Sequence, residues 1–333
     1  MSRLGWAAVL ALVSTAIGAC SLLTDTDGLT GGADAGGTGD AADVTTAPAG
    51  DGATNADGSA TGDGNVAEDA GQDAGATCVD DAGCSGGPCV SGRCLVDPTV
   101  VASAGVKLFG LVVTDSTLFF GSNTRIYTRG LDGGALAIVD DGGALGQMAA
   151  DDRYVYFPRN GDISRLPLSG SGTTLVHSQV DSPITTVATS GSEILFIGPD
   201  PGNPGPTSLF TLPVDGGVPT EQLKSQLTYG EALFVANGTI YIADRLADCV
   251  WTVAVNGPTA SKLLQVPGAN GVFVAPPLMW VTSYGTGTVY RTLADGTGPL
   301  EAIAVGQTAP SQIVVTASDV YFLAGANVMR LPR

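Results

Sequence analysis

The sequence predicts an all-β protein, a six-bladed β-propeller preceded by a disordered tether. Two observations support this fold class. An aromatic-centred phrase recurs six times within residues 99–333, and no segment with helical periodicity separates the copies. A period near 40 residues with four short strands in each copy is typical of propeller blades. The residues before the repeats have a different composition, which predicts separate segments.

Residues 1–20 are predicted to be a secretory signal peptide. The segment MSRLGWAAVLALVSTAIGAC has one Arg, then an apolar run too short for a membrane span, then small residues before Cys20. Its end resembles the lipobox of bacterial lipoproteins, which implies acylation of Cys20. Ser21 after it implies routing to the outer membrane or cell surface. A plain signal peptide followed by an unrelated Cys is the alternative.

Residues 21–77 are predicted to be a disordered linker. They contain 11 Asp or Glu and no Lys, Arg, His or aromatic residue. Such a segment cannot bury enough apolar surface to offset the entropy of ordering it. A calcium loop is the alternative, but the Asp-x-Asp-x-Asp-Gly phrase of an EF-hand is absent. We therefore expect a flexible tether.

Residues 78–98 are predicted to form a small disulfide module. Four Cys lie in CVDDAGCSGGPCVSGRC, at spacings that differ from the Cys-x2-Cys pairs of structural zinc sites. Disulfides are favoured over zinc because an exported chain meets an oxidising environment. The stretch is similar to short Cys-rich modules of predicted myxobacterial surface proteins. Of three possible pairings we favour Cys78 with Cys89 and Cys84 with Cys94. Cys249 is expected to be a buried core thiol.

Residues 99–333 contain the six copies. An aromatic residue lies mid-strand in each, at Phe119, Tyr156, Phe196, Tyr241, Trp280 and Tyr321. An apolar anchor precedes each aromatic residue, at Val112, Ala149, Val187, Phe234, Phe273 and Val314. The step from anchor to aromatic is seven residues in five copies and nine in the third, which predicts a hairpin. A third strand follows in every copy, and it ends at a turn rich in Gly, Asn or Asp.

The fourth strand is present in five copies and missing from the sixth. The segment TVVA at residues 99–102 lies upstream of the first copy, and Val101 precedes Val112 by the eleven residues that separate fourth strands from the next anchors in four other cases. We therefore predict that this N-terminal strand completes the last blade and closes the ring, which leaves no open sheet edge.

The fourth copy carries a family resemblance. TIYIADRLADCVWTVAVNG resembles the Tyr-Trp-Thr-Asp repeats of low-density-lipoprotein-receptor propellers, with Tyr241 and Asp244 in the signature places. The other copies are similar to the same broad group, which includes TolB-like and NHL-type propellers. The resemblance implies the propeller fold. It implies no shared ligand scheme, because the other five copies have no counterpart of Asp244.

Charge and motifs exclude several functions. From Thr99 onward there are 18 acidic and 12 basic residues, a net charge of −6. This acidic balance does not favour binding to nucleic acid. The single His, His177, falls in a predicted outermost strand, and no Gly-x-Ser-x-Gly or His-Glu-x-x-His motif is present. Nucleophile-base catalysis is therefore not supported, and no cofactor is expected. A divalent ion held by oxygen ligands in the channel is an alternative that the sequence leaves open.

Candidate contact residues lie on loops expected at the channel. Asp151, Asp152 and Asp248 are acidic loop residues there, and the residues that we expect to contact a ligand or partner are Arg159, Tyr229, Glu231, Asp244, Arg245 and Tyr284. Asp244 could instead hold a turn by hydrogen bonds. The favoured function is a non-enzymatic envelope lipoprotein that displays a binding or scaffold module for an extracellular or periplasmic protein or carbohydrate. A metal-dependent hydrolase or lactonase acting on a sugar-like ligand is the alternative.

Overall fold

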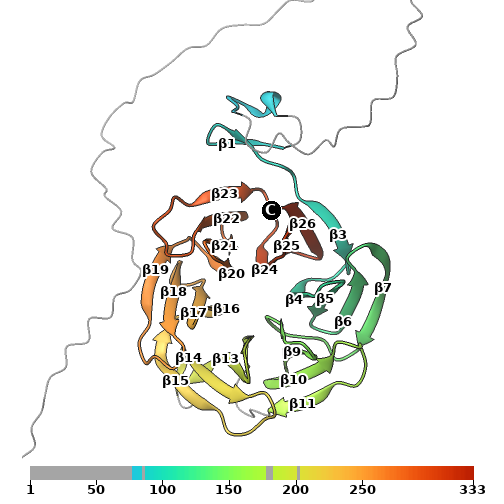
Figure 1. The fold of residues 1–333 in the computed structure, drawn as a ribbon, viewed down its shortest axis with the longest axis vertical. Coiled ribbons are helices and arrows are strands. Elements are labelled where there is room, and N and C mark those ends of the chain that lie inside the picture. Colours follow the sequence, from blue (N-terminus) through green and yellow to red (C-terminus); the bar gives the residue numbers. More distant parts are fainter. Residues whose placement is uncertain (1–76, 85–86, 178–182, 201–202) are drawn as a thin grey trace, which may run out of the picture. The chain divides into compact units, whose positions relative to one another are not determined.

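The computed structural model describes residues 77–84, 87–177, 183–200 and 203–333. The predicted signal peptide, Cys20 and nearly all of the predicted linker lie outside these ranges. Six four-stranded antiparallel sheets are arranged around a central axis, with the first strand of each sheet nearest the centre (Figure 1). The one helical element of the described ranges is the 3-10 turn η1 (Asp81–Gly83), so none of their helices could span a membrane.

The six blades follow one another along the chain. Blade 1 contains β4 (Leu108–Val113), β5 (Thr117–Ser122), β6 (Ile126–Gly130) and β7 (Gly133–Asp140). Blade 2 contains β8 (Ala149–Ala150), β9 (Tyr154–Arg159), β10 (Asp162–Pro167) and β11 (Thr174–His177). Blade 3 contains β12 (Thr186–Ser190), β13 (Glu193–Asp200), β14 (Asn203–Pro213) and β15 (Thr220–Leu227).

Blades 4 to 6 repeat this order. Blade 4 contains β16 (Gly230–Ala236), β17 (Thr239–Asp244), β18 (Cys249–Ala254) and β19 (Ser261–Gln265). Blade 5 contains β20 (Ala269–Ala275), β21 (Leu278–Ser283), β22 (Thr288–Leu293) and β23 (Glu301–Ala304). Blade 6 contains β24 (Pro310–Val315), β25 (Asp319–Ala324), β26 (Asn327–Pro332) and the N-terminal strand β3 (Thr99–Ser103).

The predicted hairpin of first and second strands is confirmed in every blade. Each apolar anchor of a first strand lies directly opposite the aromatic residue of the second strand: Val112 and Phe119, Ala149 and Tyr156, Val187 and Phe196, Phe234 and Tyr241, Phe273 and Trp280, Val314 and Tyr321. Cross-strand pairs of apolar and aromatic residues are a main source of sheet stability. The longer step of the third copy lengthens its hairpin without changing this pairing.

The predicted ring closure is also confirmed. Strand β3 pairs antiparallel with β26, with Ala102 opposite Val328, Val100 opposite Met329 and Thr99 opposite Arg330. The first described strand of the propeller thus completes the sheet of the last blade (Figure 1).

The core is divided among the spaces between neighbouring blades. Six clusters of buried hydrophobic side chains fill these spaces, one for each adjacent pair of blades, including the pair of blades 6 and 1. Trp280 of blade 5 packs with Phe322 of blade 6 in one of them. Between blades 2 and 3 the backbone passes so close that a Cβ on Gly146 would lie 1.8 Å from the carbonyl oxygen of Thr185. This position therefore requires glycine.

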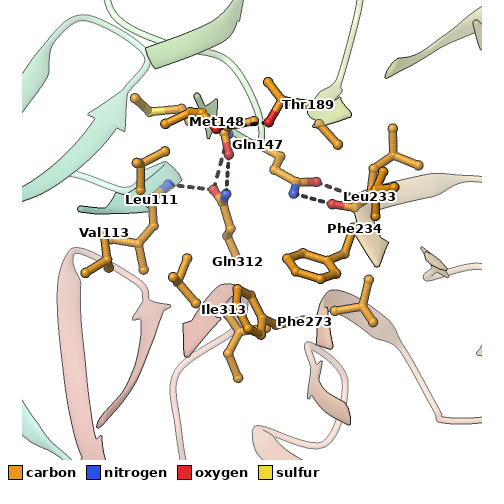
Figure 2. A pocket seen from close by; sticks show the side chains of 17 residues that line it. Leu111, Val113, Gln147, Met148, Thr189, Leu233, Phe234, Phe273, Gln312 and Ile313 are labelled. Atoms are coloured by element: carbon orange, nitrogen blue, oxygen red, sulfur yellow. Dashed lines mark hydrogen bonds between the residues drawn. The ribbon is translucent and has the colours of Figure 1, made fainter. Parts of the chain in front are cut away.

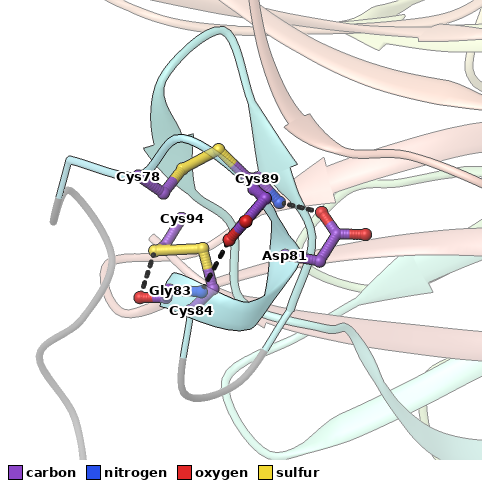
Figure 3. The surroundings of a disulfide bond; sticks show 7 residues. Cys78, Asp81, Gly83, Cys84, Cys89 and Cys94 are labelled. Atoms are coloured by element: carbon purple, nitrogen blue, oxygen red, sulfur yellow. Dashed lines mark hydrogen bonds between the residues drawn. A yellow bond between two sulfur atoms is a disulfide. The ribbon is translucent and has the colours of Figure 1, made fainter.

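The Cys-rich segment forms a hairpin of β1 (Cys89–Val90) and β2 (Arg93–Cys94). Its disulfides join Cys78 to Cys89 and Cys84 to Cys94, the pairing that the sequence analysis favours (Figure 3). The Asp81 carboxylate accepts a hydrogen bond of 2.8 Å from the Cys89 N–H. Cys249 lies in β18, outside both disulfides, and is fully buried as expected.

Candidate functional site: the polar mouth of the channel

Two cavities lie along the central channel. One, of about 230 Å³, opens at the end where the innermost strands begin, and we call it the polar mouth. The other, of about 180 Å³, is lined mainly by Leu, Val, Ala, Ile and Phe side chains from the later parts of the same strands. Gln147 and Gln312 are the two residues that line both cavities, so their side chains separate the polar mouth from the apolar cavity.

Gln312 connects three blades. Its side chain reaches from β24 of blade 6 toward blades 1 and 2 (Figure 2). The Oε1 atom accepts hydrogen bonds from the N–H groups of Leu111, at 2.5 Å, and Met148, at 3.4 Å, and Nε2 donates to the carbonyl oxygen of Met148 at 2.7 Å. A buried amide whose partners are all backbone groups fixes the positions of those backbones.

Gln147 does the same on the other side of the channel. Its Nε2 donates to the carbonyl oxygen of Leu233 at 2.7 Å, and its Oε1 accepts from the Leu233 N–H at 2.6 Å and from the Thr186 hydroxyl. The segment that enters blade 2 is thereby joined to the innermost strands of blades 3 and 4. Together the two glutamines connect five of the six blades across the channel.

The guanidinium of Arg245 contacts three other side chains of the polar mouth. Arg245 follows β17, and its guanidinium lies 5.1 Å from the ring centroid of Tyr229 and 5.2 Å from that of Tyr284. Its Nε atom lies 2.9 Å from the Glu231 carboxylate. Two cation–π contacts and an ion pair hold the guanidinium in one place.

Lys107 brings a second cation to the polar mouth from the segment before β4. Its ammonium lies 5.1 Å from the ring centroid of Phe109 and 5.9 Å from that of Tyr284. Within the described ranges no carboxylate lies within ion-pair distance of it, whereas Arg245 has Glu231. Tyr284 is therefore shared by two cations, and its side chain is 36% exposed.

Glu231 is the one acidic side chain that lines the polar mouth. Burial raises its pKa, and this effect outweighs the opposing effect of Arg245 and Lys107, with Asp244 raising the pKa further. Glu231 therefore loses its charge at a higher pH than an exposed glutamate does.

Asn270, at the beginning of β20, is a functional candidate that the sequence analysis missed. It lines the polar mouth and is 9% exposed, yet its amide has no hydrogen-bond partner among the described residues. A nearly buried amide normally finds partners, so one without any is available to a ligand. The signal in the sequence is only an Asn next to a glycine at the start of a first strand, and Asn-Gly is common in turns.

The structure brings four of the six predicted contact residues together. Tyr229, Glu231, Arg245 and Tyr284 all line the polar mouth. Asp244 lies beneath it, is fully buried, and accepts hydrogen bonds from the N–H groups of Thr228, Tyr229 and Ala247 at 2.7 to 3.1 Å. Asp244 therefore stabilises a turn by hydrogen bonds, which the sequence analysis gave as the alternative to ligand contact. Through these bonds it positions Tyr229 and the segment around Arg245.

Arg159 lies away from the polar mouth. It forms an ion pair with Asp140 of β7 and packs over the ring of Phe157 at 4.9 Å. Burial alone would raise the pKa of Asp140, but hydrogen bonds from Thr173 and the Gly142 N–H, together with Arg159, lower it. Through these contacts the Arg159 side chain joins blades 1 and 2.

The expectation for Asp151 and Asp152 was wrong. Both follow the end of β8, and the polar mouth is at the end where β8 begins, so they lie at the opposite end of the channel. Asp151 accepts hydrogen bonds from the N–H groups of Arg153 and Tyr154 and from the Tyr156 hydroxyl, which closes the hairpin turn. Asp248 likewise accepts from the Gly268 N–H at 2.6 Å and does not line the polar mouth.

The polar mouth does not fit a divalent cation. Hard cations take six or more oxygen ligands, usually with several carboxylates. Here one carboxylate is already paired with Arg245, and a lysine ammonium lies nearby. Among the described residues, the one group of three His, Cys, Asp or Glu side chains close enough to share an ion is Cys78, Cys84 and Cys94, whose sulfurs are in disulfides.

Comparisons with known proteins support the fold. No protein-family model matches the chain, and no curated protein matches it in sequence. Regucalcin, a calcium-binding protein from Agrobacterium tumefaciens, is 11% identical, with a TM-score of 0.60 over 71% of this chain and 93% of its own. A gluconolactonase from Xanthomonas campestris is 17% identical, with a TM-score of 0.57 over 71% and 94%. A chain of a nidogen–laminin complex is 14% identical, with a TM-score of 0.53 over 61% and 83%.

At these identities the likeness shows a shared fold and nothing finer. The propellers that resemble this chain include gluconolactonases as well as a component of a nidogen–laminin complex. The six-bladed architecture is therefore shown, and the low-density-lipoprotein-receptor group is not singled out.

Proposed function

We propose that this protein is an exported lipoprotein that binds a ligand at the polar mouth of its propeller without catalysing a reaction. The predicted acyl anchor at Cys20 and the predicted linker at 21–77 would tether it to the outer membrane or cell surface. The partner would be an extracellular or periplasmic carbohydrate or protein.

One observation carries the binding function: chemically different side chains from three blades converge on a single cavity. Lys107 comes from the entry to blade 1, Tyr229, Glu231 and Arg245 from blade 4, and Tyr284 from blade 5. Convergent polar groups around an aromatic-lined cavity are typical of ligand sites. Among the described residues that line it, the polar mouth holds no nucleophile with an adjacent base and no set of metal ligands, which favours binding over hydrolysis.

The gluconolactonase with this fold favours the alternative of a metal-dependent lactonase. The single paired carboxylate of the polar mouth does not support it. Lactone hydrolysis that requires a divalent ion and is lost on Glu231→Gln substitution would establish this alternative and overturn the binding proposal.

The test of the binding function uses the purified full-length protein and a collection of monosaccharides, sugar acids, oligosaccharides and peptides. We expect at least one compound to raise the melting temperature, and we expect the Tyr284→Ala protein to lose that increase. The control is Leu175→Ala, which removes a side chain that is 60% exposed on the outermost strand of blade 2. Binding that survives Tyr284→Ala would place the ligand site elsewhere.

A further inference from the structure

The polar mouth is cationic in a protein that is acidic as a whole. The full chain has a formal net charge of −18. The charged side chains that line the polar mouth are Lys107, Arg245 and Glu231, two cations and one carboxylate. Since Glu231 is paired with Arg245, the charge left without a protein partner in the polar mouth is that of Lys107.

Lys107 is placed where a ligand could reach it. Its side chain is exposed, and the contacts of its ammonium are the faces of Phe109 and Tyr284. An ammonium that has aromatic neighbours and lacks a carboxylate gains a charge-assisted hydrogen bond when an anion binds.

Asn270 points independently to a ligand. It is nine-tenths buried, lines the same cavity, and has no side-chain partner among the described residues. Its amide can donate a hydrogen bond to a carboxylate or exchange hydrogen bonds with a hydroxyl. A ligand that reaches both Lys107 and Asn270 would give a partner to the ammonium and to the nearly buried amide.

The size and walls of the polar mouth restrict the rest of the ligand. Its volume of about 230 Å³ is below the roughly 300–1,000 Å³ of pockets for drug-sized ligands, so the ligand is small. Tyr284 is 36% exposed although Lys107 and Arg245 lie over its ring, and Ser311 and Thr185 line the same cavity and carry hydroxyls. A six-membered ring could lie against the part of the tyrosine that stays exposed.

We propose that the polar mouth binds a small monoanion: a carboxylate carried on a six-membered ring, with the carboxylate at Lys107 and Asn270 and the ring against Tyr284. This inference rests on the proposed function, because it assumes that the polar mouth is the ligand site. Glu231 acts here as a positioning residue that holds Arg245. It also leaves the polar mouth with a net charge of one positive unit, which matches the charge of a single carboxylate.

The experiment measures binding to the full-length protein by calorimetry at low ionic strength, with two matched pairs of probes. D-glucuronate is compared with D-glucose, and benzoate with benzamide. We expect the charged member of at least one pair to bind at least about tenfold more tightly than its neutral partner. Glucuronate alone would identify a sugar acid, benzoate alone an aromatic acid, and both together a general ring carboxylate; each supports the proposal.

Variants assign the effect to the polar mouth. Lys107→Met should weaken carboxylate binding about tenfold or more and leave the neutral probe unchanged. Lys224→Met, which removes an exposed lysine of β15 in blade 3, is the matched control and should change nothing. Circular dichroism and melting curves confirm that each variant is folded, which is expected because Lys107 is exposed.

Three results would overturn the inference. Equal affinity for charged and neutral probes, lost in Tyr284→Ala, would refute a carboxylate site and leave the proposed binding function standing. Carboxylate binding that Lys107→Met and Lys224→Met weaken equally would show a general charge effect rather than a site. Failure of all four probes to bind would also refute the carboxylate site, and the wider compound collection described above then decides whether the polar mouth binds any ligand.

Discussion

At the scale of single residues, the two channel glutamines, Gln147 and Gln312, join different blades by hydrogen bonds, whereas the β-sheet ladders join only strands of one blade. Adjacent blades pack through side chains, and in the part of the chain that the structure describes their innermost strands share no ladder of hydrogen bonds. The side-chain amides of Gln312 and Gln147 form hydrogen bonds with backbone groups across the channel and so fix the distances between strands that line the polar mouth. The glutamines are therefore part of the support of the candidate site.

A substitution of Gln312 tests this role. Gln312→Met keeps the approximate volume and removes the amide, which leaves the Leu111 N–H and the Met148 carbonyl oxygen without their buried partner. We expect the free energy of unfolding, measured by urea denaturation, to fall by about 2–4 kcal/mol, since each buried group left unpaired costs about 1–3 kcal/mol.

The control for this change is Gln226→Met, at an exposed glutamine of β15 whose two hydrogen bonds, with the Pro258 carbonyl oxygen and the Ala260 N–H, are 3.3 Å long and open to water. We expect it to change stability by no more than about 0.5 kcal/mol. Equal stability of the Gln312→Met and wild-type proteins would show that the crossing amide contributes nothing.

At the scale of strands, the closing strand β3 is the element on which the ring depends. Without it, β26 would be an open sheet edge, and its residues Val328 and Met329 would lose their antiparallel partners. The neighbouring space between blades 6 and 1 also contains Ala102 of β3 in its buried cluster.

Deletion of residues 99–102 tests the closure. We expect a lower melting temperature and faster amide hydrogen exchange in β25 and β26, because an exposed edge and a broken core cluster destabilise blade 6 first. Removal of four residues from the predicted linker, 53–56, is the control and should leave both measurements unchanged. If the deletion of 99–102 behaves like this control, β3 is dispensable.

Local repetition explains why the strands were predictable and the site was not. Each hairpin is set by an anchor and an aromatic residue a few positions apart, so a single copy contains the information for its own register. By contrast, Gln312 and Met148 are 164 residues apart in the sequence, and the residues around each of them carry no pattern that predicts their contact. Asn270 was missed for the same reason, since its lack of partners depends on the surrounding blades.

The direction of strands explains the misplaced acidic residues. Asp151 and Asp152 look like channel residues because they border a first strand, but loops after first strands lie at the other end of the channel from loops before them. Tyr229 and Glu231 were placed correctly because they lie at the beginning of β16.

At the scale of the whole molecule, the proposed arrangement is an anchor, a linker, a disulfide hairpin and a ring with one ligand-binding end. A linker of the predicted composition would hold the propeller away from the membrane without fixing its orientation. A polar mouth on such a support could meet ligands from many directions.

The anchor is tested in the native host by metabolic labelling with palmitate. We expect the wild-type protein to be labelled and to partition into the membrane fraction, and we expect Cys20→Ala to lose both properties, because the lipid would be attached at this Cys. Cys249→Ala is the control for loss of a thiol elsewhere and should stay labelled. Undiminished labelling of Cys20→Ala would refute the anchor.

The closure by β3 also sets an order of events during synthesis. Thr99 of β3 contacts Arg330, 231 residues later in the chain, so the first strand of the ring leaves the ribosome long before its partner exists. Until β26 has been made, β3 lacks the strand with which it pairs in the finished ring. Such non-local pairing slows folding and exposes the waiting strand to other chains. Correct folding therefore requires that β3 does not pair with another chain before the last blade has been made.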